Sequence, residues 1–168
     1  GPLGQLIVEG GLDFFDGDPV FGDGVKGNLS MTVVDQLKVT TQALFGKKDF
    51  FYFYLDANVA LPGPGIVIST LPAPPISVFG MGAGVYYNLE PIIKPLANPL
   101  DLLITGDKGP SANYTPKLGT FGFKGNVLMG TTDRFMIQTT CELEAVMSNL
   151  PFGNLTLDRI IFTGELYS

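Results

Sequence analysis

The sequence predicts an all-β or mainly β domain, built as an antiparallel sandwich or barrel of about eight to ten strands. Apolar and polar residues alternate with a period of two along most of the chain, which is typical of half-buried strands. The 22 glycines and 13 prolines favour many strands and turns over helices. A stretch of about twenty residues also occurs twice, which indicates a duplicated supersecondary unit.

The internal repeat relates residues 25–46 to residues 123–144. VKGNLSMTVVDQLKVTTQAL and FKGNVLMGTTDRFMIQTTCE match at a constant offset of 98 residues. Each copy predicts a β-hairpin, with turns near 34–36 and 132–134. Asp35 and Asp133 fall in these turns, where aspartate can bond to the nearby backbone. The repeat therefore indicates architecture.

The other strands follow from the same alternation. Residues 50–61 are the clearest strand: Phe, Leu, Ala and Val occupy one side, and Tyr52, Tyr54, Asp56 and Asn58 the other. Further strands are expected at 28–33, 37–45, 121–129, 135–145 and 160–166. We expect one face of the sheet, the apolar one, to pack and the polar face to be wet.

Two proline-rich stretches interrupt the strands. Residues 61–76 cannot be a central strand, because proline donates no ladder hydrogen bond, and a short extended piece is expected at 66–69. Residues 90–116 predict a second long loop. Helical patterns are scarce: 100–104 and 139–150 are the best candidates, and strand alternation fits the first half of 139–150 better.

Length and composition restrict the class of protein. Residues 1–4 (GPLG) match the scar left by a tag-removing protease, and residues 5–168 predict one β domain. The net charge of −6 argues against nucleic acid and against an anionic membrane surface as partners. With no histidine, Ser-His-Asp catalysis and His-ligated metals are excluded. The one cysteine, Cys141, allows no internal disulfide and is read as a small core residue.

An acidic, glycine-rich segment at 12–24 is the best metal candidate. Asp13, Asp16, Asp18 and Asp23 could supply the hard oxygen ligands that Ca²⁺ prefers. The alternative is a turn in which Asp and Gly satisfy the backbone, and this alternative is favoured because the EF-hand pattern is absent. No other cofactor is expected.

Three further groups have a structural and a functional interpretation. Tyr52, Tyr54, Asp56 and Asn58 could form a ligand surface for a sugar or a protein. The favoured alternative is that they pair across strands or are covered by a loop. Gly80, Gly82 and Gly84 share one strand face, which favours close packing over phosphate binding. Glu142 and Glu144 share a face and are expected to be solvated rather than catalytic.

Several segments in the same order resemble a known module: LDFFDGDPVFGDGVKGNL, ALFGKKDFFYFYLDANVALP, ISVFGMGAGVYYNL and LGTFGFKGNV. The module is found in very large, β-rich, mostly uncharacterised bacterial proteins. Phe53 departs from its pattern, which more often has Trp there. The resemblance implies a part of a secreted, cell-surface or injected protein. Some such proteins resemble cargo or effectors of phage-tail-like contractile injection systems. The resemblance brings no catalytic residues.

Three function classes remain open from the sequence. The first is a non-catalytic structural or binding module, with other domains of its parent protein or a protein or glycan as partner. The second is a carboxylate-dependent hydrolase that uses Asp13, Asp16, Asp56 or Glu142. The third is a membrane-active, toxin-like β protein, which the proline-rich stretches disfavour. The oligomeric state is left open.

Overall fold

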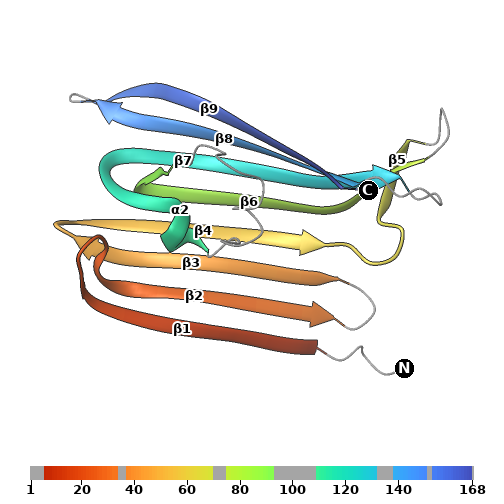
Figure 1. Ribbon diagram of the computed structural model, residues 1–168, viewed down its shortest axis with the longest axis horizontal. Helices are drawn as coiled ribbons and strands as arrows, with labels where there is room; N and C mark the ends of the chain where they lie inside the picture. The colour runs from red at the N-terminus through yellow and green to blue at the C-terminus, as the bar shows by residue number, and fades with distance from the viewer. Residues whose placement is uncertain are drawn as a thin grey trace.

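The nine strands found among the described residues lie in one open antiparallel sheet. The computed structural model describes residues 6–33, 37–69, 75–92, 109–131, 138–150 and 153–167. Eight long strands cross the sheet in the order β1-β2-β3-β4-β6-β7-β8-β9, and β5 pairs with β6 at one end (Figure 1). The predicted mainly β, antiparallel class is confirmed. The sheet is not closed into a barrel, and within the described residues no second sheet covers it.

The element bounds are as follows: β1 Leu6–Asp18, β2 Gly22–Val33, β3 Lys38–Lys48, β4 Phe50–Ala60, β5 Ile66–Ser69, β6 Ile76–Pro91, α2 Pro110–Asn113, β7 Tyr114–Thr131, β8 Gln138–Leu150 and β9 Asn154–Tyr167. The short extended piece predicted at 66–69 is β5. The helix candidate at 139–150 is wrong, because this segment is strand β8. The other candidate, at 100–104, and the GPLG residues lie outside the described residues.

The repeated segments both form hairpins, but their registers differ. In the first copy, β2 and β3 pair Lys26 with Leu44; in the second, β7 and β8 pair Lys124 with Glu144. A strict repeat would pair Lys124 with Glu142, so the second hairpin is shifted by two residues. A shift of two keeps every side chain on its original face. The predicted turns at 34–36 and 132–134 lie in undescribed residues.

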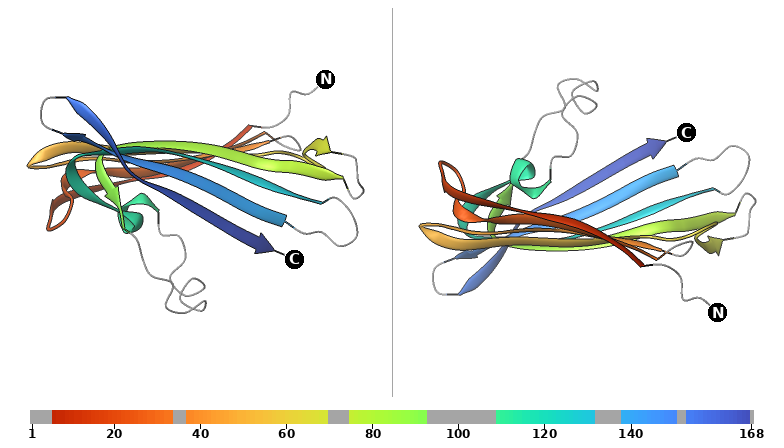
Figure 2. Two further views of the ribbon diagram at one scale, coloured as in Figure 1. Left: turned by 90° about the horizontal axis from the view of Figure 1, so that it is seen from above. Right: turned by 90° about the horizontal axis from the view of Figure 1, so that it is seen from below.

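One end of the β6–β7 pair curls over the sheet. In Figure 2, which views the sheet nearly edge-on, α2 and the start of β7 stand to one side of it. The pairing shifts register between Tyr87 and Leu89, where Asn88 has a positive φ of 55°. Asn tolerates this left-handed conformation better than most residues. The curl places Leu89 and Tyr114 over the sheet, where they pack with Leu44, Tyr52, Tyr54 and Tyr86.

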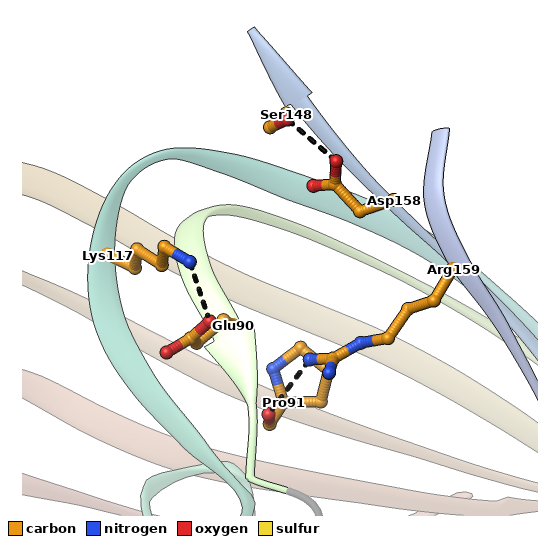
Figure 3. Close-up of polar contacts among 6 residues, drawn as sticks. All are labelled: Glu90, Pro91, Lys117, Ser148, Asp158 and Arg159. Atoms are coloured by element: carbon orange, nitrogen blue, oxygen red, sulfur yellow. Dashed lines mark hydrogen bonds and ion pairs between the residues drawn. The ribbon is translucent and has the colours of Figure 1, made fainter. Parts of the chain in front are cut away.

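Polar contacts hold the curl in place (Figure 3). The Lys117 ammonium pairs with the Glu90 carboxylate at 3.2 Å, and the Arg159 guanidinium on β9 donates to the Pro91 carbonyl at 3.4 Å. Between β8 and β9, the Ser148 hydroxyl donates to Asp158 at 2.9 Å. The curl is thereby connected to β9, far from it in sequence.

The curl reverses the expected burial of the two sheet faces. We predicted that the apolar face of β4 packs and that its tyrosine face is wet. Instead Tyr52 and Tyr54 are 2% and 1% exposed, whereas Phe51 and Leu55 are 70% and 44% exposed. The prediction was wrong because period-two alternation separates the faces without telling which one the rest of the chain covers.

Candidate functional site

A buried polar cluster lies beneath the curl. We call it the tyrosine–carboxylate cluster; its members are Tyr54, Tyr86, Tyr114, Asp56, Glu144 and Lys124. The Tyr114 ring lies 4.9 Å from that of Tyr54 and 4.8 Å from that of Tyr86, between centroids. Its hydroxyl donates to Glu144 at 2.8 Å, and the Tyr54 hydroxyl donates to Asp56 at 2.5 Å. The predicted ligand residues Tyr54 and Asp56 therefore bond to each other.

Lys124 supplies the positive charge of the cluster. Its ammonium lies 5.0 Å from the centre of the Tyr54 ring and 5.6 Å from that of Tyr114. The register places Lys124 directly beside Glu144 on β8, and one strand removed from Asp56 across Gly84. No pattern in the sequence singles out Lys124 or Tyr114 for this role. Glu144 is only 6% exposed, so the expectation that it is solvated was wrong.

Burial makes these tyrosines even weaker acids than tyrosine in water. Burial, followed by the hydrogen bond to Asp56, raises the pKa of Tyr54 above its usual range, and burial and Glu144 do the same for the pKa of Tyr114. Burial also raises the pKa of Tyr86, and it raises the pKa of Tyr52 to about 12. Proton transfer near neutral pH favours groups whose pKa lies near 7. The four tyrosines are therefore poorly suited to proton transfer near neutral pH, and they pack the curl against the sheet.

The glycines of β3, β6 and β7 make room for these side chains. Tyr86 lies over Gly122 and Tyr52 over Gly46, in each case across to the neighbouring strand. Gly82 leaves space for Asn126 on β7 to donate to Asn58 on β4 at 3.0 Å, across the strand between them. The close-packing interpretation of Gly80, Gly82 and Gly84 is therefore supported at Gly82. The hydrogen bond from Asn126 also shows that Asn58 has a side-chain partner.

A pair of glycine substitutions on the polar face tests this packing. A methyl group at Gly122 would overlap the Tyr86 hydroxyl and approach the Ala145 carbonyl, whereas one at Gly11 meets no atom within 4 Å. We expect Gly122→Ala to lower the free energy of unfolding by about 1–3 kcal/mol, as overpacking does. Gly11→Ala should change it little or raise it by about 0.4–1 kcal/mol. Denaturant unfolding of both variants checks this, and equal losses would contradict it.

The acidic segment is mostly strand rather than loop. Asp13 and Asp16 lie within β1, and only residues 19–21 separate β1 from β2. Asp18 accepts from the backbone N–H groups of Val20 and Phe21, which lower its pKa. Asp23 accepts from the N–H of Gly17, which lowers its pKa, and Asp23 raises the pKa of Asp16 by a hydrogen bond and by its charge. Asp18 and Asp23 thus accept hydrogen bonds from the backbone of the turn, as the alternative to a metal site predicts.

The calcium site stays a prediction. In the part of the chain that the structure describes, no three Asp, Glu or Cys side chains gather as a metal-binding group. Asp13 lines two neighbouring clefts of about 380 and 430 Å³, together with Lys26 and Ser111. Asp18 also lines the larger cleft. Asp56 and Glu142 line neither cleft. The predicted hydrolase carboxylates are thus not brought together in one of them.

The opposite side of the sheet is a continuous apolar surface. We call it the apolar face and define it as the side chains that the strand register places on the side of Leu55. Phe123 is 53% and Phe162 70% exposed. Every long strand contributes large members, which include Val8, Leu12, Phe14, Leu29, Phe45, Phe53, Val85, Phe123, Leu143 and Ile160. Soluble monomers rarely expose apolar patches beyond a few hundred Å².

Comparisons with known proteins do not add to this picture. The chain matches no protein-family model, no curated protein and no solved structure. The resemblance to the bacterial module therefore stays a prediction. Among the described residues, no helix has the length and the apolar character needed to cross a membrane.

Proposed function

We propose that this chain is a non-catalytic structural module that acts by association, as part of a large secreted, cell-surface or injected bacterial protein. The observation that carries the proposal is the exposed apolar face of a chain whose net charge is −6. Water contact with such a face is unfavourable by about 25 cal/mol for each Å² of apolar surface. A second protein layer on this face would remove that cost.

The organisation of the polar face supports the same proposal. Three of its buried hydroxyls bond internally: Tyr54 to Asp56, Tyr114 to Glu144, and Tyr52 to the Phe21 carbonyl at 2.6 Å. The Tyr114 bond ties the curl to β8, and the Tyr52 bond ties the β1–β2 turn to the sheet. The polar side thus stiffens the module, and the apolar side remains for a partner, such as another domain of the parent protein.

The chain's one cysteine can test whether the apolar face is covered. Cys141 lies on this face, paired with Val127 and Gly164. In the native protein we expect a thiol reagent to modify Cys141 at least tenfold more slowly than in guanidinium-unfolded protein. Leu55→Asp, which puts a charge into the face, should speed the reaction. Asn28→Asp, which adds the same charge on the polar face, should not.

Two results would overturn the proposal. One is a Cys141 thiol that reacts as fast in the native protein as in the unfolded one, in a protein that associates with nothing. The other is turnover on a panel of glycosides, peptides and phosphodiesters that a single substitution of Asp13, Asp16, Asp56 or Glu142 abolishes. The second result would favour the carboxylate-dependent hydrolase.

A further inference from the structure

We infer that the partner of the apolar face is a second copy of this chain, so that two sheets pack face to face as a two-layer sandwich. The inference rests on the proposed function and adds the identity of the partner. Three features of the face carry it: its area, its lack of charge, and the distribution of its large and small side chains.

The area of the apolar face suits a stable homodimer. Across the sheet the register forms four apolar rows, each contributed by eight strands; the row through Leu55 runs from Leu12 on β1 to Ile160 on β9. With strands about 4.8 Å apart and rows about 6.7 Å apart, the face covers roughly 1,000 Å². Two copies would bury about 2,000 Å², which reaches the range of obligate homodimers.

Charge does not oppose this pairing. Within the four rows, the described residues include no Asp, Glu, Lys or Arg. At one end of the rows Asp23 faces Lys47, which has the opposite sign, and Asp16 hydrogen-bonds to Asp23. The chain has a net charge of −6, so contact through any acidic surface would be repulsive. The apolar face is the surface on which two copies can meet without burying a charge.

The side chains of the face vary in size in the way that a second sheet requires. A central band of small side chains, Thr41, Ala57, Ala83 and Gly125, crosses β3, β4, β6 and β7. On β4 this band lies between Leu55 and Val59. In a sandwich the sheets lie about 10 Å apart, and large side chains of one layer enter spaces over small ones of the other.

An aqueous sandwich also suits the edges of the sheet better than the hydrocarbon of a bilayer does. β1 and β9 each pair on one side only. Their remaining backbone groups can be hydrated at the rim of a sandwich. In hydrocarbon each unpaired group would cost several kcal/mol. Lipid is therefore the competing outcome of the test and not the inference.

Mass measurements test the inference on the intact chain. Light scattering after size exclusion and sedimentation velocity, both without detergent, should give twice the chain mass of 18.0 kDa. Leu55→Asp should raise the dimer dissociation constant at least a hundredfold, and Asn28→Asp should leave it unchanged. In case Leu55→Asp does not fold, Phe162→Asp is the second variant, because Phe162 lies on the apolar face and is 70% exposed; it should weaken the dimer in the same way.

The possible outcomes separate the inference from the proposed function. One outcome is a monomer whose Cys141 is protected, or a monomer that binds detergent or phosphatidylcholine vesicles. This outcome would contradict a second copy as the partner but would remain consistent with the proposed association module. A dimer that Leu55→Asp does not weaken would place the contact elsewhere and also overturn the inference. A monomer with a reactive Cys141 that binds none of these would overturn both.

Discussion

Raising the pH above 10 is expected to unfold this protein cooperatively. Tyrosine in an unfolded chain ionises near pH 10. Burial raises the pKa values of Tyr54, Tyr86 and Tyr114 well above this, and that of Tyr52 to about 12. A raised pKa in the folded state gives stability that is fully present below pH 10. It is lost as the pH rises from 10 toward the folded values, because only the unfolded state releases protons there.

The decline should be steep because several tyrosines act together. Each group contributes about 1.4 kcal/mol per pH unit, so Tyr54, Tyr86 and Tyr114 predict a fall of up to about 4 kcal/mol per unit. An ordinary stability of about 5–15 kcal/mol would be lost within a few pH units. Tyrosinate absorbance and far-ultraviolet circular dichroism should change together. The absence of tryptophan keeps the tyrosinate signal free of overlap.

A tyrosine substitution provides the control. In Tyr114→Phe the free energy of unfolding should fall less steeply above pH 10, by about 1.4 kcal/mol per pH unit, because one titrating group is removed. The substitution also removes the hydrogen-bond donor to Glu144. If tyrosinate absorbance reached all six tyrosines while the dichroism stayed unchanged, the rings would be ionising in the folded protein. The proposed burial of the cluster would then be wrong.

Asn88→Ala is expected to be the most damaging single substitution. Asn88 is 4% exposed; its side-chain amide donates to the Phe51 carbonyl at 2.7 Å, and its side-chain oxygen accepts from the Gly119 N–H at 2.8 Å. Alanine would leave both backbone groups without these partners, at a cost of about 1–3 kcal/mol each when buried. Its positive φ adds strain for alanine. We expect a loss of about 2–5 kcal/mol in the free energy of unfolding.

Two further variants separate the causes of that loss. Asn88→Gly removes both hydrogen bonds but tolerates the positive φ, so it should lose less than Asn88→Ala. Asp49→Gly is the matched control, since Asp49 has a φ of 63° on an exposed hairpin turn. It should leave stability nearly unchanged. Denaturant unfolding measures the stability of all three variants. An Asn88→Ala variant as stable as the wild type would show that the two Asn88 hydrogen bonds do not hold the curl.

The sequence alone determined most of the strands and the two sides of the sheet, but it did not predict β1, which carries part of the acidic segment. Alternation separated Tyr52, Tyr54, Asp56 and Asn58 from the phenylalanine side of β4, and the register confirms that separation. The repeat predicted two hairpins, and both exist. The glycines of 80–84 were assigned to one face. These properties are local, because the period of a strand fixes where each side chain points.

Tertiary structure decided which side is covered and which residues meet. Asn88, a single polar residue in a strand pattern, gave no signal of the curl, since its partners Phe51 and Gly119 are far away in sequence. The curl then brings Tyr114 to Glu144 and Tyr54, and buries a face that looks solvated by composition. The two-residue shift of the second hairpin was likewise invisible to an alignment of the repeats. Contacts between distant segments depend on the path of the chain, and alternation does not specify that path.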